Sequence, residues 1–237
     1  MAAVWTNISD AVFQHAKSRP RDVAVIEGPT SLTFGRFAEL VAKATVFLKQ
    51  QKIKSGDRVG IRMTNSADHL ILSLALLRIG AVKFELSPNH PPKDLDEITR
   101  KFSLATLLVE PPMKIYRNAR TIIIDTAWRA SIESLNGDIR HADKSGEPWY
   151  ADLSGRASGS RAVAVRHAQT IARYHELVAG YGATGIISAK EPATFLMFGG
   201  MYFTGLHAML LAQMMSGATI VMLPEFLRFY DIVRNFR

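Results

Sequence analysis

The stretch from Tyr150 to His167, YADLSGRASGSRAVAVRH, holds the residue types best suited to chemistry. It contains two Gly, three Ser and three Arg. Small residues let a loop turn tightly and present backbone N–H groups, and Arg adds fixed positive charge. This combination suits a phosphate-bearing ligand. The same composition is typical of a flexible surface loop, and no Gly-Lys-Ser/Thr closes the stretch as in a Walker P-loop.

The composition is that of a soluble globular protein. The chain has 237 residues, of which 48% are hydrophobic and 21% charged, enough for one large domain or two modest ones with a buried core. Its net charge of +8 allows a nucleic-acid partner. The basic residues are scattered, however, without dense runs or interleaved aromatics, so an ordinary basic surface is the better interpretation and we expect no nucleic-acid partner.

Several classes of site and location are excluded or disfavoured. The sequence has no Cys, which rules out disulfides and thiolate chemistry. The seven His residues show no metal-ligand spacing with carboxylates, so we expect no metal site of the chain's own. The most apolar segments, 70–79 and 203–215, are too short to span a bilayer, and no signal peptide is evident. We therefore expect a cytoplasmic protein without membrane contact.

Apolar periodicity predicts helices and strands that alternate along the chain. The expected helices are 7–17, 36–50, 67–78, 94–102, 167–178, 202–215 and 225–234. The expected strands are 23–26, 31–34, 58–63, 81–86, 105–109, 121–125, 162–165, 193–198 and 218–223. Residues from about 131 to 148 are polar and poorly periodic, which indicates a surface connection.

This alternation predicts an α/β architecture with largely parallel sheets. A faint internal repeat indicates two similar subdomains, because LALLRIGAVKFELSP (74–88) and MLLAQMMSGATIVMLP (209–224) both read as buried helix, Gly-Ala, apolar strand, Pro. We expect residues 1–150 to form a first subdomain with a small N-terminal hairpin and helix. Residues 151–237 then contain the Ser/Arg-rich loop and part of a second subdomain.

Four segments, in this order, resemble the N-terminal part of the adenylate-forming (AMP-binding) superfamily. That superfamily includes acyl- and aryl-CoA synthetases, adenylation domains of peptide synthetases, and luciferases. Residues 31–48 are similar to its opening hairpin and helix, and residues 74–92 to its helix–Gly–strand–Pro segment. SGRASGSRAVAVRH (154–167) matches the length of its phosphate loop, SGTTGxPKGVxxTH, and residues 198–223 resemble its second apolar helix, Gly-Ala and strand.

The resemblance implies a phosphate-binding loop, although its residues depart from the family pattern. The residues implied to bind the cofactor are Ser154, Gly155, Arg156, Ser158, Gly159, Ser160 and Arg161. Arg156 and Ala157 replace two hydroxyl-bearing Thr residues, and Arg161 keeps the charge of a Lys without its compact ammonium. Ser158 and Ala162 stand where the family has Gly and restrict the backbone. Arg156 points either at a phosphate or at solvent.

Two further positions depart from the family. Tyr202 stands where the family commonly has a His on the substrate side, so the resemblance implies that Tyr202 contacts a ligand. The alternative is a structural role, as a half-buried Tyr at the start of a helix. Glu85 sits where a Pro is usual. Apolar residues around Tyr202, namely Phe198, Met201 and Phe203, favour an apolar acid as substrate.

The implied activity is ATP-dependent activation of a carboxylic acid. Such enzymes join the carboxylate to the α-phosphate of ATP with magnesium, expel pyrophosphate, and then usually form a thioester. The family's adenine-binding, ribose-binding and magnesium-binding residues, and its C-terminal domain with the catalytic Lys, lie beyond Arg237. We therefore expect that this chain alone does not complete adenylation.

Three interpretations stay open. In the first, the chain is the N-terminal portion of an acyl- or aryl-CoA-ligase-like protein. It is then a piece of a longer protein, a shortened gene product, or one subunit of a split enzyme whose partner is a downstream half. Alternatively, it is a non-catalytic binding or scaffold module derived from that family. Nucleic-acid binding ranks last. Apolar surface left uncovered after Arg237 predicts self-association.

Overall fold

The computed structural model describes residues 5–112, 118–137, 148–154, 161–181 and 193–223. The helices are α1 (Asp10–Ser18), α2 (Phe34–Gln50), α3 (Ala67–Ile79), α4 (Pro92–Lys101), α5 (Thr126–Glu133), α6 (His167–Tyr181) and α7 (Thr204–Ser216). The strands are β1 (Val23–Glu27), β2 (Thr30–Thr33), β3 (Arg58–Arg62), β4 (Val82–Glu85), β5 (Thr106–Val109), β6 (Arg120–Ile123), β7 (Pro148–Ser154), β8 (Arg161–Arg166), β9 (Thr194–Met197) and β10 (Thr219–Met222).

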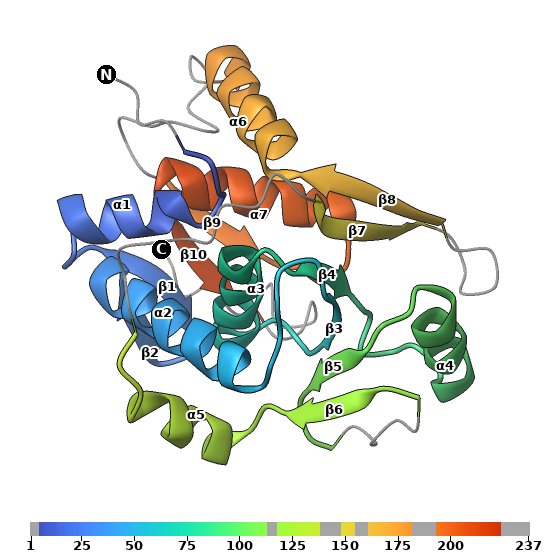
Figure 1. The fold of residues 1–237 in the computed structure, drawn as a ribbon. Helices are drawn as coiled ribbons and strands as arrows, with labels where there is room; N and C mark the ends of the chain where they lie inside the picture. The colour runs from blue at the N-terminus through green and yellow to red at the C-terminus, as the bar shows by residue number, and fades with distance from the viewer. Residues whose placement is uncertain (1–4, 113–117, 138–147, 155–160, 182–192, 224–237) are drawn as a thin grey trace.

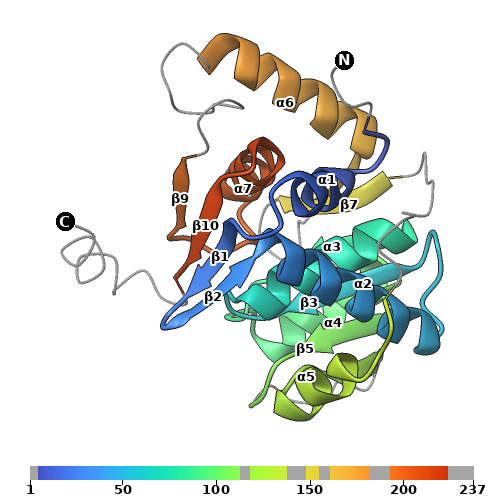
Figure 2. The same cartoon turned by 90° about the vertical axis from the view of Figure 1, so that its left-hand side faces the viewer.

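A four-stranded sheet joins the two ends of the described chain. Its strand order is β2-β1-β10-β9. β1 and β2 form an antiparallel hairpin, whereas β1 pairs in parallel with β10 and β10 in parallel with β9. The N-terminal hairpin therefore completes a sheet whose other strands come from the far end of the described chain, and Figure 2 shows this sheet beside α7.

A six-stranded sheet contains the middle of the chain, in the order β6-β5-β3-β4-β7-β8. β6, β5, β3, β4 and β7 pair in parallel, and β8 closes the edge antiparallel to β7. The β7–β8 hairpin projects from this sheet, and α6 follows directly from β8 (Figure 1). The architecture is thus mixed α/β with largely parallel sheets, as the sequence predicts.

Helices fill the space between the two sheets. α2 packs along α3, and both contact β1 of the four-stranded sheet, while α3 also contacts β4 of the six-stranded sheet. α7 lies against β9 and β10 and contacts α1 and α6. The main hydrophobic core runs through this helical layer, and a smaller cluster including Phe84, Leu95 and Leu107 lies under α4. α3 is buried on nearly every side, as expected for a helix enclosed by neighbours.

The predicted helix–Gly–strand repeat is present in both sheets. α3 ends at Gly80 with φ 79° and α7 at Gly217 with φ 83°, and both glycines adopt the left-handed conformation that closes a helix. The backbone N–H of each glycine caps its helix before the chain enters β4 or β10. The two copies therefore lead into strands of different sheets.

Most expected elements occur within a few residues of their predicted positions, with two corrections. Residues 126–133 form α5, although the sequence predicts no element there and a polar connection from about residue 131. Residues 148–154 form β7, where the sequence predicts the start of a loop. The expected helix 225–234 lies outside the described residues. Strands from both sides of residue 150 contribute to each sheet, and the division into 1–150 and 151–237 stays a prediction about subdomains.

The left-handed caps give a stability prediction. In Gly80→Ala, a Cβ is forced into the left-handed region, which costs about 1–2 kcal/mol. The matched control is Gly180→Ala in α6, where a Cβ meets no heavy atom within 4 Å and Ala has the better helix propensity. Urea unfolding should show a loss for Gly80→Ala and no loss for Gly180→Ala. Equal stabilities of the two variants would contradict the capping role.

Candidate functional site

The predicted phosphate loop falls between two paired strands. Ser154 at the end of β7 is the register partner of Arg161 at the start of β8, and the described hairpin extends from this pair back to Pro148 and Arg166. Gly155, Arg156, Ser158, Gly159 and Ser160 lie outside the described residues. The flanking strands thus belong to one hairpin of one sheet, and the phosphate-binding role of the loop stays a prediction.

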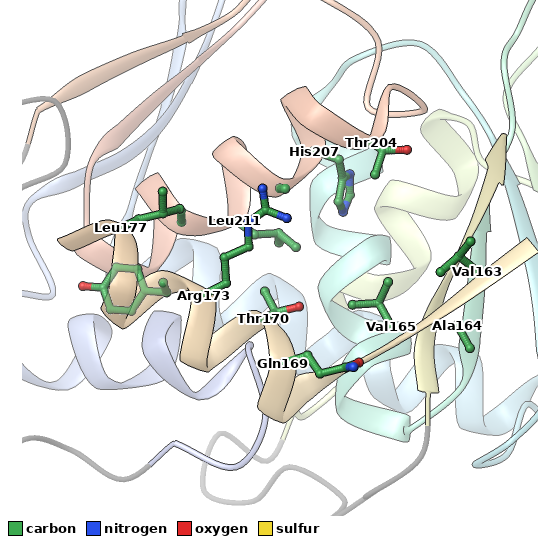
Figure 3. Close-up of a pocket in the computed structure, with 13 residues that line it drawn as sticks. Val163, Ala164, Val165, Gln169, Thr170, Arg173, Leu177, Thr204, His207 and Leu211 are labelled. Carbon is green, nitrogen blue, oxygen red and sulfur yellow. The ribbon is translucent and has the colours of Figure 1, made fainter. Parts of the chain in front are cut away.

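A cavity of about 260 Å³ lies between β8, α6 and α7. Its walls are mainly aliphatic, with aromatic and polar groups contributed by the two helices (Figure 3). The lining residues are Val163, Ala164, Val165, Gln169, Thr170, Arg173, Tyr174, Leu177, Thr204, His207, Ala208, Leu211 and Ala212. An apolar cavity with a few polar groups is the usual form of a small-molecule site. The same strand that leaves the predicted phosphate loop therefore walls this cavity.

Two side chains in the lining of this apolar cavity, Arg173 and His207, are able to carry a positive charge. The Arg173 side chain extends from α6 toward α7, and the His207 ring lies on the opposite wall (Figure 3). Arg173 is exposed, whereas His207 is only 1% exposed because α7 packs against the interior. The cavity thus has a solvent-facing cation on one helix and a buried imidazole on the other.

His207 is hydrogen-bonded to a cluster of buried polar residues. Lys83 of β4 is 0% exposed, and its Nζ lies 2.9 Å from His207 Nε2 and 2.5 Å from Glu85 Oε1. Nζ also donates a hydrogen bond to the hydroxyl of Ser73 on α3. An ammonium has three N–H donors, and these three acceptors match them. The geometry therefore fits a charged Lys83.

Glu85 connects Lys83 to His69. Its Oε2 lies 2.7 Å from His69 Nε2, and its Oε1 also accepts a hydrogen bond from Ser73. His69 Nδ1 lies 3.1 Å from the carbonyl oxygen of Thr64. Both ring nitrogens of His69 thus lie within hydrogen-bonding distance of an oxygen atom. We refer to Lys83, Glu85, His69, Ser73 and His207 as the buried cluster.

Burial and mutual charges shift the pKa values of this cluster. Burial alone would raise the pKa of Glu85, but Lys83 and His69 outweigh it and hold that pKa well below its usual range. Burial lowers the pKa of Lys83, and the Glu85 carboxylate opposes that effect. Burial also lowers the pKa of His207 to about 3, with the Lys83 charge adding to the shift. His207 is therefore neutral at physiological pH.

His167, at the start of α6, is a second buried neutral imidazole. Its Nδ1 accepts a hydrogen bond from the backbone N–H of Ile8 at 3.1 Å, which ties the N-terminal segment to α6. Burial lowers the pKa of His167 to about 4, and the charge of Lys83 contributes in the same direction. His167 is the residue aligned with the His that ends the family's phosphate-loop motif, and here it anchors the helix after the hairpin.

Tyr202 lies just before α7, in a segment held by its neighbours. The Asn65 amide donates to the Gly199 carbonyl at 2.6 Å, and its Oδ1 accepts from the Met201 N–H at 3.1 Å. Tyr202 is half-buried, and its ring centroid lies 4.7 Å from that of Phe203. The cavity lining on α7 begins at Thr204 and does not include Tyr202. The substrate role of Tyr202 stays a prediction.

The spacing of polar residues in two apolar segments of the sequence is the signal for the buried cluster. Lys83 and Glu85 are two residues apart in a strand, so their side chains share one face, inside the apolar run AVKFEL. His69 and Ser73 are four apart on a largely apolar helix, which also places them on one face. Polar residues at matching spacing within buried elements indicate a cluster, but the contact with His207 depends on tertiary structure.

Two broader observations concern metals and membranes. Within the described ranges, no three His, Asp or Glu side chains are grouped so that they would hold a metal ion. Across the same residues, every helix is too short or too polar to cross a lipid bilayer.

The comparisons with known proteins identify the family. The model of the AMP-binding enzyme family matches residues 12–237. The chain is 24% identical over 235 residues to 4-coumarate–CoA ligase 5 of Oryza sativa subsp. japonica, covering 92% of this chain and 43% of the ligase. It is 23% identical over 209 residues to a linear gramicidin synthase of Brevibacillus parabrevis, covering 86% of this chain and 3% of the synthase polypeptide.

Solved structures share the fold. The N-terminal domain of FACL13 from Mycobacterium tuberculosis, solved with an inhibitor, has a TM-score of 0.82 at 17% identity and covers 97% of this chain and 61% of that chain. The AMPPNP-bound nonribosomal peptide synthetase FmoA3 has a TM-score of 0.79 at 15% identity and covers 93% of this chain and 23% of that chain. This chain spans less than half the length of the ligase and of the gramicidin synthase.

The fold is that of the N-terminal part of adenylate-forming enzymes. The chain belongs to the AMP-binding enzyme family, as its sequence resemblance predicts. Its described cavity and hairpin lie within the matched residues.

The neutral, buried His167 predicts a loss of stability in mild acid. Its pKa is about 4 in the folded chain and 6.5 without the protein's influence, so the unfolded chain binds a proton first as the pH falls. The free energy of unfolding should therefore decrease as the pH falls from 6.5 toward 4, on the order of 3 kcal/mol from this residue. Urea unfolding followed by circular dichroism across this range measures the slope.

Two variants separate His167 from the other titrating groups. His167→Gln retains an acceptor for the Ile8 N–H but takes up no proton, so its stability should fall less steeply with acid. His175→Gln, on the exposed side of the same helix, is the control and should keep the original slope. Identical slopes for the original chain and His167→Gln would show that His167 is not neutral in the folded state.

The buried cluster predicts a non-additive effect on stability. Glu85→Gln removes the carboxylate that neutralises Lys83 and should destabilise the chain by about 3–5 kcal/mol, as broken buried ion pairs do. The double variant Lys83→Met/Glu85→Gln removes both charges, and the new amide at position 85 is able to donate to His69 Nε2. It should recover most of that loss. A double variant no more stable than Glu85→Gln would contradict the ion pair.

Proposed function

We propose that the chain is the N-terminal portion of an AMP-dependent synthetase or ligase. In this proposal it contributes the phosphate loop and one wall of the acid site to ATP-dependent activation of a carboxylic acid. The acyl-adenylate is then converted to a thioester in the complete enzyme. A downstream half supplies the adenine-binding and ribose-binding residues and the C-terminal domain with the catalytic Lys.

One observation carries this proposal: a single strand, β8, leads from the predicted phosphate loop to an apolar cavity. The Ser154–Arg161 pair frames the loop at one end of the hairpin, and Val163 and Val165 line the cavity farther along. A ligand in the cavity would thus have its carboxylate near nucleotide phosphates bound by the loop. Adjacent binding of acid and ATP is what acyl-adenylate formation requires.

The chain's own residues would hold ATP through its phosphates. Ser154, Gly155, Ser158, Gly159 and Ser160 offer hydroxyls and backbone N–H groups, and Arg161 a fixed charge. ATP with magnesium supplies the electrophilic α-phosphate when bound, and positive charge placed beforehand stabilises the pyrophosphate that leaves.

The family does not define the acid. Its members similar to this chain include a protein named for 4-coumarate and a protein named VinN that was solved with L-aspartate. In this chain the aliphatic lining favours an acid with an apolar body. The cavity volume of about 260 Å³ suits a small one.

A second function is favoured by the altered loop. Arg156 and Ala157 replace two Thr hydroxyls, and Ser158 and Ala162 replace two glycines of the family motif, which removes phosphate ligands and restricts the backbone. In this alternative the chain is a binding or scaffold module without ATP chemistry. Phe203, 55% exposed, and Phe198, 36% exposed, would then contribute to a contact with a second copy or another protein.

Nucleotide binding distinguishes the two functions. Calorimetry with ATP and magnesium should detect binding to the chain, or to its mixture with a candidate downstream half, and Arg161→Ala should reduce that affinity at least about tenfold because it removes a charge-assisted phosphate contact. The matched control is Arg166→Ala, at the other end of the same strand, which should bind as the original chain does.

The outcomes differ for each function. Affinity that depends on Arg161 and is present in the chain or the mixture supports the ligase. Absence of binding in both preparations supports the scaffold. Binding that Arg161→Ala leaves unchanged would remove the phosphate role of this residue.

A further inference from the structure

The described lining of the cavity between β8, α6 and α7 contains basic side chains and no acidic ones. Its thirteen described lining residues include Arg173 and His207 but no Asp or Glu. A ligand group that enters here meets mainly aliphatic walls with a few hydroxyls, one amide and one guanidinium. A cationic ligand group would find no described carboxylate in the lining to pair with, and burying an unpaired charge is strongly unfavourable.

The buried cluster adds positive charge directly behind one wall. Lys83 Nζ lies 2.9 Å from His207 Nε2, so the ammonium is separated from the cavity by a single imidazole ring. Within the cluster, the Lys83 ammonium is the group bonded to His207, whereas the Glu85 carboxylate bonds to Lys83, Ser73 and His69. The cluster therefore presents its positive group, and not its carboxylate, to the imidazole that lines the cavity.

This charge acts on the cavity with little screening. Lys83, Glu85 and His69 are 0%, 4% and 1% exposed, and charges removed from solvent are screened far less than surface charges. The influence of Lys83 on its surroundings is visible at two histidines. The ammonium contributes to lowering the pKa of His207 on α7 and of His167 at the start of α6.

We propose that the buried cluster, acting through His207 and together with Arg173, makes the cavity selective for carboxylic acids that carry no amino group. This inference rests on the proposed function, because it assigns the class of acid that the cavity admits. The class comprises aryl or short acyl acids, and it excludes α-amino acids, whose ammonium would lie in a positive field without a carboxylate partner. Lys83 is in this view a specificity-determining residue that never touches the ligand.

Glu85 and Lys83 belong to a segment in which the related family usually has a Pro at the position of Glu85. The Glu85 carboxylate is therefore a departure of this chain from that pattern. The Lys83–Glu85 pair does not follow from the fold, since an apolar pair at these positions would fill the same space.

A matched pair of probes tests the proposal. 3-Phenylpropionate and L-phenylalanine share the same carbon skeleton and carboxylate and differ by the α-ammonium. Titration of the full chain, followed by NMR shifts of residues that line the cavity, gives both dissociation constants. At physiological ionic strength, where surface charges farther than about 8 Å are screened, we expect 3-phenylpropionate to bind at least about tenfold more tightly.

Variants assign the discrimination to the buried cluster. Lys83→Met removes the ammonium that is bonded to His207 and should bring the ratio of the two dissociation constants toward one. The double variant Lys83→Met/Glu85→Gln removes both charges and keeps a hydrogen-bonding group opposite His69 Nε2. If the single variant does not fold, the ratio of dissociation constants is measured with this double variant. Lys93→Met, an exposed substitution on α4 far from the cavity, is the control for total charge and should keep the original ratio.

Each outcome has one meaning. A ratio that collapses in the Lys83 variants and persists in Lys93→Met supports the proposal. Equal or tighter binding of L-phenylalanine, or a ratio unchanged in folded Lys83 variants, overturns it while leaving the proposed function intact. If neither probe binds in the cavity, the proposed acid site fails and the selectivity assigned to it fails as well.

Discussion

The ammonium of Lys83 places the strictest constraint on this structure. It is fully buried, and it is hydrogen-bonded to Ser73 on α3, Glu85 on β4 and His207 on α7. A buried charge is tolerated only when its hydrogen bonds are complete. The three elements must therefore keep one relative position, and that position connects the six-stranded sheet to the helix that packs on the four-stranded sheet. The wall of the cavity at His207 is fixed by the same requirement.

Other buried or partly buried polar side chains connect the layers in the same way. Asn65, after β3, bonds to the backbone of Gly199, Met201 and Leu223 and so fixes the segments before and after α7. Glu27 of β1 accepts a hydrogen bond from the N–H of Ala67 at the start of α3, where the helix dipole favours a carboxylate. Hydrophobic burial brings the layers together without direction. These directional bonds then determine how the layers are aligned.

Local patterns predicted the features that depend on neighbouring residues. Thr33 caps α2 by accepting from the Arg36 N–H, and Gly80 ends α3, as their sequences indicate. The helix α5 has too few turns to show a periodicity, and β7 runs directly into the Ser/Gly-rich stretch that indicates a loop, so local patterns predict neither element. The contact between Lys83 and His207 joins residues 124 positions apart. No local pattern predicts such a contact, because it depends on which strands lie side by side.

Stability alone does not explain the buried cluster. Exchanging a buried ion pair for apolar residues of similar volume is often neutral or stabilising, and α3, β4 and α7 are otherwise rich in apolar side chains that would accommodate such an exchange. What an apolar replacement cannot reproduce is the electric field of Lys83 at His207 and hence at the cavity. A positive field there raises the free energy of a bound ammonium and lowers that of an anion. The electric field of Lys83 is therefore the property that an apolar replacement would remove, and it acts on a ligand in the cavity.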